Sequence, residues 1–249
     1  MADMTSTLFT TAESAPSESI NVAFVEAGIT DGYDFYREIH KGIRYAMNQA
    51  TIETGRLDVN DNDRVEAVLA GITDLFDLLH LHHHHEDVFV QPLIEAHAPD
   101  LAMIVTAQHI DVDEGIVHLG RLCQNLASVA QPGRSQAAHR LYLDLTRLTS
   151  AYLAHQLVEE VEVMPRLRAA VPTEKLLQLD MELRASVPPP VMADVMAFML
   201  PAMNVEERVD MLTGMSMAPP QVFAILRRAA KNALPAADWS VIADRLGLK

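Results

Sequence analysis

Apolar residues recur every three to four positions along most of this chain, which is the spacing of one buried face of an α-helix. Four long stretches keep this period. They run from after Asp31 to about 54, from the Asn-Asp cluster at 60–63 to about 97, from about 100 to 129, and from about 134 to 170. Long amphipathic helices with short connections predict an all-α fold, built as an antiparallel four-helix bundle.

Prolines and glycines set the expected helix ends. Gly55 is predicted to end the first helix, and the sequence Gln131-Pro132-Gly133 is predicted to be a plain turn. Pro92 lies inside the second stretch, where its missing N–H predicts a break or bend. The composition agrees with helices, because aromatic residues make up only 5% of the chain and there are only 10 glycines.

The chain outside these stretches predicts two further segments. Residues 1–28 are rich in Ser, Thr and Ala and are expected to form a flexible arm before a bundle domain at 29–171. Residues 172–249 predict a helical extension, with eight of the 13 methionines between 181 and 217. Its short helices are expected at 173–186, 190–200, 204–214, 218–232 and 236–246. This Met-rich extension is interpreted as adaptable core or as a cover for the bundle, and a homo-oligomer could form through it.

Polar, metal-ligating side chains fall on the apolar faces of all four predicted long helices. On the second helix, His82 and His83 straddle the centre of the face and Glu86 lies near its middle, whereas His84 and His85 point away. The other helices place the following residues on their stripes: His40; His109 and Asp113; His155 and Glu159. Because buried polar groups need partners, these residues are candidates for a metal site.

The second and fourth helices share one motif. His82-x3-Glu86 with Pro92 recurs as His155-x3-Glu159 with Pro165, and in each copy an acid, Asp87 or Glu160, follows the glutamate. A histidine and a glutamate four residues apart lie one turn apart on the same helix face. One histidine precedes each copy, at His40 and at His109. The spacing therefore predicts that four histidines and two glutamates meet in the interior.

Four imidazoles and two carboxylates suit two metal ions, with the carboxylates bridging. Imidazole with carboxylate favours iron, manganese or zinc, and iron fits oxygen chemistry best. His83 is the alternative to His82, since it also shares a face with Glu86, and the match between His82 and His155 favours His82. A single inward histidine is more often an ordinary core residue, but four unpaired imidazoles in one core are energetically unfavourable.

In these motifs the chain resembles the HHE cation-binding domain of the hemerythrin-like superfamily, over about residues 30–170. The resemblance implies an oxo- or hydroxo-bridged, non-heme di-iron centre in a four-helix bundle. The implied ligands are His40, His82, Glu86, His109, His155 and Glu159, with the glutamates bridging.

The sequence departs from the oxygen carriers of that superfamily at Asp113, where they have a fifth histidine. The departure argues against reversible oxygen carriage and in favour of ligands such as peroxide or nitric oxide. Asp113 itself could be a ligand, an acceptor for an imidazole N–H, or a proton shuttle. Tyr33, Tyr36 and Tyr152 lie on inward stripes; core packing is the favoured interpretation, and Tyr36 is kept as a candidate neighbour of the ligands.

Charge and targeting signals narrow the partners. The formal net charge of −15 opposes nucleic-acid binding, and Cys123 is the only cysteine, which excludes an intramolecular disulfide and fits a reducing compartment. No signal-type segment and no run of about 18 apolar residues occurs, so no membrane association is expected and a cytoplasmic location is predicted.

These observations predict a di-iron protein that binds or turns over O2, peroxide or NO, with catalase- or peroxidase-like activity as its enzymatic form. The alternative is a non-catalytic module that senses, stores or carries iron, oxygen or NO. A third interpretation is a structural metal site that only stabilises the helices.

Overall fold

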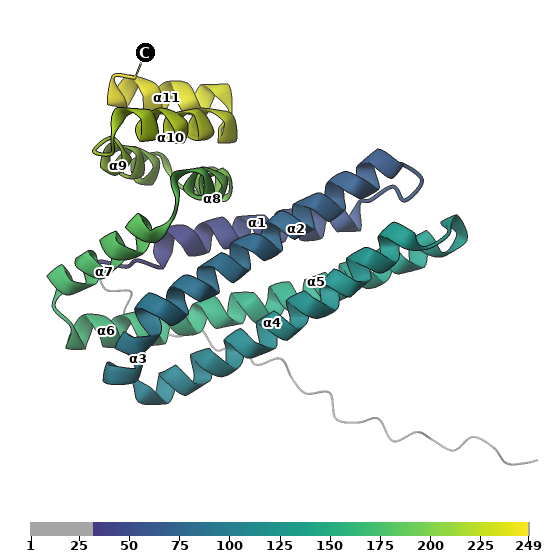
Figure 1. The fold of residues 1–249 in the computed structure, drawn as a ribbon, viewed down its shortest axis with the longest axis horizontal. Helices are drawn as coiled ribbons and strands as arrows, with labels where there is room; N and C mark the ends of the chain where they lie inside the picture. Colours follow the sequence, from purple (N-terminus) through teal and green to yellow (C-terminus); the bar gives the residue numbers. More distant parts are fainter. Residues whose placement is uncertain (1–31, 249) are drawn as a thin grey trace, which may run out of the picture.

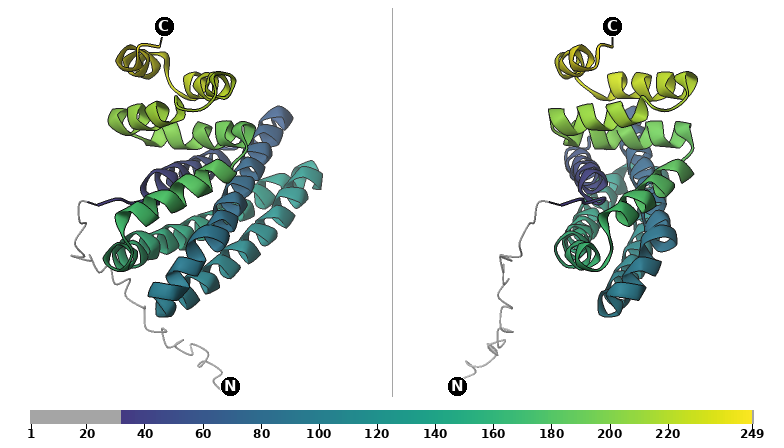
Figure 2. Two further views of the ribbon diagram at one scale, coloured as in Figure 1. Left: turned by 60° about the vertical axis from the view of Figure 1, so that its left-hand side comes forward. Right: turned by 90° about the vertical axis from the view of Figure 1, so that its left-hand side faces the viewer.

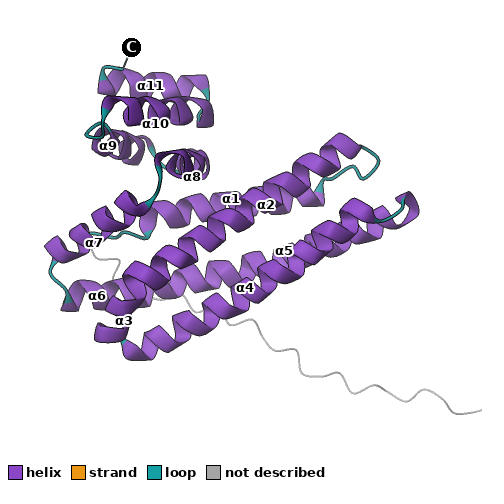
Figure 3. Ribbon diagram, in the orientation of Figure 1, coloured by secondary structure: helices purple, strands orange, loops and turns teal. Residues whose placement is uncertain are grey.

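The computed structural model describes residues 32–248, and the part of the chain it describes is helical throughout, with no strand (Figure 3). The all-α prediction is confirmed for these residues. The expected arm at 1–28 lies outside the described residues. Four long helices lie side by side (Figure 1): α1 (Arg37–Gly55), α2 (Asn62–His85), α4 (Pro99–Ser128) and α5 (Gln131–Val158).

Each of the four long helices packs against two of the others, so that together they form a ring. Helix α1 contacts α2 and α5, and α4 also contacts α2 and α5. The buried faces carry the residues that the periodicity predicts, including Ile43 of α1, Ile72 of α2, Ile116 of α4 and Leu141 of α5. No described helix is both long and apolar enough to span a membrane.

Two predicted helix boundaries were wrong. Helix α1 begins at Arg37 rather than after Asp31, because the Asp34 side chain accepts a hydrogen bond from the Tyr36 N–H at 3.0 Å and holds a turn there. The sequence Gln131-Pro132-Gly133 is the first turn of α5 rather than a separate turn. Proline is well suited to a first turn, since its missing N–H would have no partner there. The second helix begins within the Asn-Asp cluster at 60–63, where the Asp61 carboxylate caps it by accepting a hydrogen bond from the Arg64 N–H.

The α-helix is interrupted just before Pro92, where a break or bend was predicted, and the interruption is a π-helical turn. The turn η1 (Glu86–Val90) joins α2 to α3 (Gln91–His97), and the Gln91 N–H donates to the Glu86 carbonyl five residues back. The same device, η2 (Glu159–Val163), joins α5 to α6 (Met164–Ala170) ahead of Pro165. Each wide turn begins at the glutamate of the repeated motif, and such turns often mark functional sites.

Five short helices follow, close to the ranges predicted from sequence. They are α7 (Thr173–Ser186), α8 (Pro189–Ala202), α9 (Val205–Met215), α10 (Pro220–Ala233) and α11 (Ala236–Leu246). Helix α8 packs on α1 and on α10, and α10 and α11 lie beyond it, on the side away from the long helices (Figure 2). Helix α9 lies beside α8 and reaches α1 through an ion pair between Lys41 and Glu207. Asn204 and Glu207 form a reciprocal capping box that starts α9.

The hydrophobic core is continuous between the long helices and the Met-rich helices. Met196, Met199 and Leu200 of α8 are buried in one cluster with Ile43 and Met47 of α1. These methionines are therefore core residues, as one of the two sequence interpretations has it. The division of the chain into a domain at 29–171 and an extension at 172–249 stays a prediction.

Gly42 allows α1 and α8 to approach closely. A Cβ added at Gly42 would lie 2.9 Å from Cγ and 3.0 Å from Cα of Met199. We expect Gly42→Ala to lower the free energy of unfolding by about 1–3 kcal/mol, because the Met199 backbone cannot move aside easily. Gly71→Ala is the matched control inside α2, where an added Cβ meets nothing within 4 Å. It should raise stability by up to about 1 kcal/mol, since alanine is the better helix former.

Urea unfolding followed by circular dichroism measures both changes. A stabilising effect at both glycines would show that α8 does not pack on α1 in solution.

Candidate metal centre

All six side chains predicted as ligands meet in the interior. They come from the four long helices and the first residues of the two π-helical turns: His40, His82, Glu86, His109, His155 and Glu159. Each is at most 7% exposed. The structure therefore brings together residues that are more than 100 positions apart in the sequence.

The two glutamates lie between the imidazoles. Nε2 of His82 lies 3.1 Å from Oε1 of Glu86, and Nε2 of His109 lies 3.3 Å from Oε2 of the same glutamate. On the other carboxylate, Oε2 of Glu159 lies 3.4 Å from Nε2 of both His40 and His155. Each carboxylate thus faces imidazoles from two different helices.

None of these inner atoms has a hydrogen-bond partner. The four carboxylate oxygens of Glu86 and Glu159 and the Nε2 atoms of the four histidines are all buried and unpaired among the described residues. Burying a polar group without a partner costs about 1–3 kcal/mol, and more where the group is charged. A cation that accepts all these lone pairs removes that cost, so the donor set fits a metal ion.

His83 also belongs to this cluster, although the sequence motif favoured His82 over it. Its side chain is only 3% exposed, and its ring stacks on that of His109 with centroids 4.2 Å apart. Its Nε2 is buried and unpaired like those of the other four histidines. His82 and His83 both face the interior, as their positions on either side of the centre of the helix face predict, and the preference for His82 as the ligand stays a prediction.

The donors divide into overlapping groups that share the glutamates. His40 and His82 form one group with Glu86 and Glu159, and His109 and His155 form a second with the same glutamates. A third group joins His83 to His109 and His155. Within each group the potential ligand atoms lie within 4.8 Å of one another. Two ions could therefore share the carboxylates, with two imidazoles on one side and three on the other.

The outer nitrogens of four of these histidines are held by acceptors. In His40, Nδ1 lies 3.0 Å from Oε1 of Glu160, and in His109 it lies 3.1 Å from Oδ1 of Asp87. In His155, Nδ1 lies 3.0 Å from Oε1 of Gln108, and in His83 it lies 3.4 Å from Oδ1 of Asp113. Donation from Nδ1–H places the Nε2 lone pair inward, as metal ligation requires.

The second acid of the repeated motif supplies two of these acceptors. Asp87 reaches His109 and Glu160 reaches His40, so each motif copy orients the lone histidine of another helix. Arg44 donates to both oxygens of Glu160 at 2.7 and 2.8 Å. Burial opposes ionisation of Glu160, but the hydrogen bonds from His40 and Arg44 outweigh it and lower the pKa to about 2.

Sequence reasoning aligned Asp87 with Glu160 but assigned them no role. It missed Gln108 and Arg44 completely. Neither of these two residues belongs to the repeated motif, and each acts on a residue of another helix.

Asp113 is placed as an imidazole acceptor. Its side chain is 53% exposed, and it contacts Nδ1 of His83 rather than the inner cluster. Among the three roles open for Asp113, this position agrees with the acceptor role. The partner is His83 of α2, a contact between helices that the sequence pattern did not reveal.

Two tyrosine hydroxyls are buried next to the cluster. The Tyr36 ring stacks on His40 with centroids 4.9 Å apart, and the Tyr152 ring lies 5.5 Å from that of His155. Neither hydroxyl has a hydrogen-bond partner among the described residues. Burial raises the pKa of both tyrosines well above the usual value, and the nearby carboxylates raise it further. Both hydroxyls therefore keep their protons. Tyr33 instead donates to Asp180, at 2.5 Å.

The buried charges determine which imidazoles are protonated without an ion. Burial lowers the pKa of His82 to about 3. Burial also acts to lower the pKa of His109, but the negative carboxylates of Glu159 and Glu86, 3.9 and 3.3 Å from its Nε2, outweigh burial and raise the pKa to about 10. Burial also acts to lower the pKa of His40, but Glu159 and Glu160 outweigh it and raise that pKa. Two imidazolium groups would thus balance the charge of two carboxylates, and bound metal cations could balance it in their place.

Comparison of the chain with protein-family models, with curated proteins and with solved structures finds no match. The assignment of this site therefore depends on its geometry and its donor set.

The acceptors around the histidines can be tested by mutation. Glu160→Gln should weaken metal binding by about 10- to 100-fold, because His40 loses its charged acceptor and Arg44 its ion pair. Glu162→Gln, two residues away and exposed, is the matched control. Competition with a coloured chelator measures the affinity, and circular dichroism checks the fold. Equal affinities for the two variants would show that Glu160 does not support the site.

Proposed function

We propose that this chain is a hemerythrin-like, non-heme di-iron protein that binds or turns over small oxygen species. In this proposal α1, α2, α4 and α5 form the antiparallel four-helix bundle of that superfamily, and two irons lie among its inward histidines and glutamates. The observation that carries the proposal is the convergence of five Nε2 atoms and four carboxylate oxygens, all buried and without a hydrogen-bond partner in the described part of the chain.

The donor set favours iron over other ions. Imidazole and carboxylate together also suit zinc and manganese, but structural zinc sites usually contain four ligands and frequently cysteine. The only cysteine, Cys123, is not in any of the potential metal groups among the described residues. Inward side chains on facing helices build the di-iron sites of helix bundles, and here two carboxylates are shared between two groups of imidazoles in the same way, with histidines in place of some of the glutamates of the ferritin-like sites.

The chain's own residues supply binding, orientation and protons. His40, His82, His83, His109 and His155 would hold the irons together with the two glutamates. Bound iron would supply the change of redox state needed for reaction with O2, peroxide or NO. The protonated hydroxyls of Tyr36 and Tyr152 are the nearest buried donors for an oxygen ligand.

A non-catalytic sensing, storage or carrier role is the second candidate. The close packing of α8 on α1 favours this second role. Gly42, which lies two residues after the candidate ligand His40 on α1, packs directly against Met199 of α8. A shift of α1 on binding would therefore reach the C-terminal helices directly.

Metal content is the first test. Full-length protein purified with ferrous iron under air should hold about two irons per chain and absorb in the near ultraviolet. Glu86→Ala and Glu159→Ala should each lose most of this iron, because each removes a carboxylate shared by both groups. Glu114→Ala on the exposed face of α4 is the control. A colourless protein with stoichiometric zinc and no uptake of iron would refute the di-iron assignment.

Turnover is the second test. Iron-loaded protein should consume hydrogen peroxide faster than the same concentration of free iron, and Glu86→Ala should abolish the difference. Oxygen release measured with an electrode distinguishes catalase-type from peroxidase-type reaction. Full iron occupancy without peroxide consumption would exclude the enzymatic form and leave the sensing or carrier role.

A further inference from the structure

Exposed apolar side chains gather on α4 more than on any other helix that the structure describes. Four of the 14 large hydrophobic side chains exposed within residues 32–248 lie on it: Met103, Ile104, Ile110 and Val117. Met103 is 73% exposed, Ile110 56% and Val117 52%. Apolar side chains that gather on one exposed face commonly mark an interaction site.

Three of these residues form a stripe with a seven-residue repeat. Met103, Ile110 and Val117 follow one another at intervals of two helical turns, and Ala107, between the first two, is also exposed. A repeat of seven keeps one face of a helix directed at a second helix that crosses it at a small angle. The repeat therefore favours another helix as the partner of this stripe.

The stripe carries little charge in a strongly acidic chain. At 3.6 residues per turn, only Glu114 and Arg121 are charged within about 40° of its centre. The outer face of α2, by comparison, exposes Glu66, Asp74 and Asp77, and the formal net charge of the chain is −15. Two copies of this protein can therefore approach through α4 with less repulsion than through α2.

Antiparallel pairing about Ile110 makes the stripe complementary to itself. When Ile110 of two copies meets at a two-fold axis, residues equally far from Ile110 on opposite sides face each other. Met103 of one copy then lies against Val117 of the other, because each is seven residues from Ile110. Each large apolar side chain of the stripe thus meets an apolar side chain.

The charges at the ends of the stripe agree with the same register. Arg121 lies 11 residues after Ile110, so it faces the start of α4 in the second copy, where Glu95 and Asp100 are exposed. Asp100 already accepts from Arg166, but neither Glu95 nor Arg121 has an ion-pair partner within residues 32–248. Opposite charges therefore meet at both ends of the antiparallel pair. A parallel pair would instead place Arg121 beside the same residue of the second copy.

A groove beside the stripe gives room to the side chains of a second copy. It has a volume of about 360 Å³ and lies between α3 and α4, with Ala102, Met103 and Ala107 among its lining residues. In the antiparallel register, residues 113–118 of the second copy lie over residues 102–107. Val117 is then the apolar side chain that enters the groove.

We infer that this protein forms a symmetric dimer through α4, with the two helices antiparallel and Ile110 at the two-fold axis. The helices overlap from Pro99 to Arg121, which is about 33 Å at 1.5 Å per residue. Sequence reasoning favoured the C-terminal extension for association, whereas this dimer uses α4. The dimer does not depend on the proposed function, because the stripe contains none of the potential metal ligands.

Cysteine cross-linking tests the register. In full-length protein with Cys123→Ala, Ile110→Cys should form a disulfide between two copies in oxidised glutathione, because these positions meet at the axis. Val117→Cys in the same background is the control, since its two copies would lie about 21 Å apart at 1.5 Å per residue. Val117→Cys combined with Met103→Cys should cross-link again. Non-reducing gel electrophoresis measures the cross-linked fraction.

Analytical ultracentrifugation tests the dimer itself. Full-length protein at micromolar concentration should sediment as a dimer, and Ile110→Glu should sediment as a monomer, because it places two carboxylates against each other at the axis. Ile52→Glu is the matched control, since Ile52 is 51% exposed on α1, and it should remain dimeric. Circular dichroism checks that both variants keep the helical fold.

Three results would contradict the dimer through α4. A full-length protein that stays monomeric, or a dimer that Ile110→Glu leaves intact, would overturn it. Cross-linking of Val117→Cys alone as fast as of Ile110→Cys would overturn the antiparallel register. A monomer that dimerises only after removal of residues 1–28 would show that these residues cover the stripe in place of a second copy.

Discussion

Two buried carboxylates that have no hydrogen-bond partner within residues 32–248 lie between the long helices, and burying them requires compensating positive charge. Glu86 and Glu159 each face imidazoles from two helices, and the four long helices each contribute at least one histidine. Without an ion, His40 and His109 would carry the compensating protons. With metal ions, the same atoms become ligands, so the packing of the helices and the binding of the metal are coupled.

The partners of the outer imidazole nitrogens connect these helices in pairs. Asp87, just after α2, holds His109 of α4, and Gln108 of α4 holds His155 of α5. Glu160, just after α5, holds His40 of α1. Because each acceptor comes from a different helix than its histidine, the orientation of the ligands depends on the packing of all four. The π-helical turns begin at Glu86 and Glu159, directly before the two acids.

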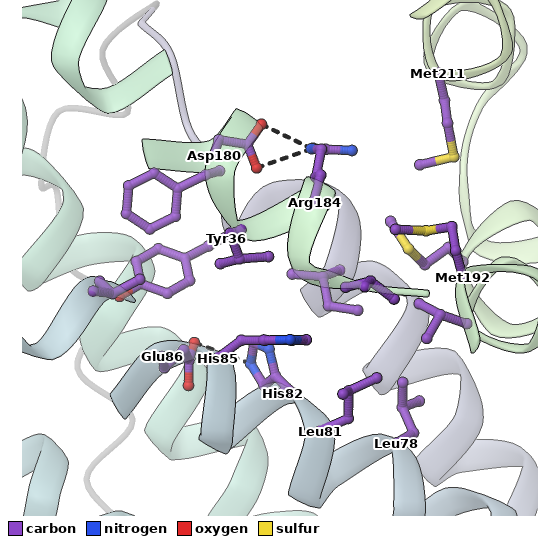
Figure 4. Close-up of a pocket in the computed structure, with 17 residues that line it drawn as sticks. Tyr36, Leu78, Leu81, His82, His85, Glu86, Asp180, Arg184, Met192 and Met211 are labelled. Carbon is purple, nitrogen blue, oxygen red and sulfur yellow. Dashed lines mark hydrogen bonds and ion pairs between the residues drawn. The ribbon is translucent and has the colours of Figure 1, made fainter. Parts of the chain in front are cut away.

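The Met-rich C-terminal helices extend this arrangement. Met196 and Met199 continue the core of the long helices, while Met192 and Met211 form one side of a largely apolar cavity of about 90 Å³, opposite α2 (Figure 4). Flexible thioether side chains fill irregular space between elements that cross at varied angles. The same segment thus packs against α1 and forms one wall of the cavity.

Local patterns in the sequence determined the helices, their inward faces and six of the clustered side chains, because a helical face repeats every 3.6 residues and His-x3-Glu spans one turn. Contacts between helices decided the rest. His83 joins the cluster because α2 turns both central histidines inward, and Gln108 and Arg44 act on histidines and acids of other helices. The cavity forms because α8 and α9 pack across from α2, more than 100 residues away in the sequence. The period of a single helix carries no information about contacts between such distant segments.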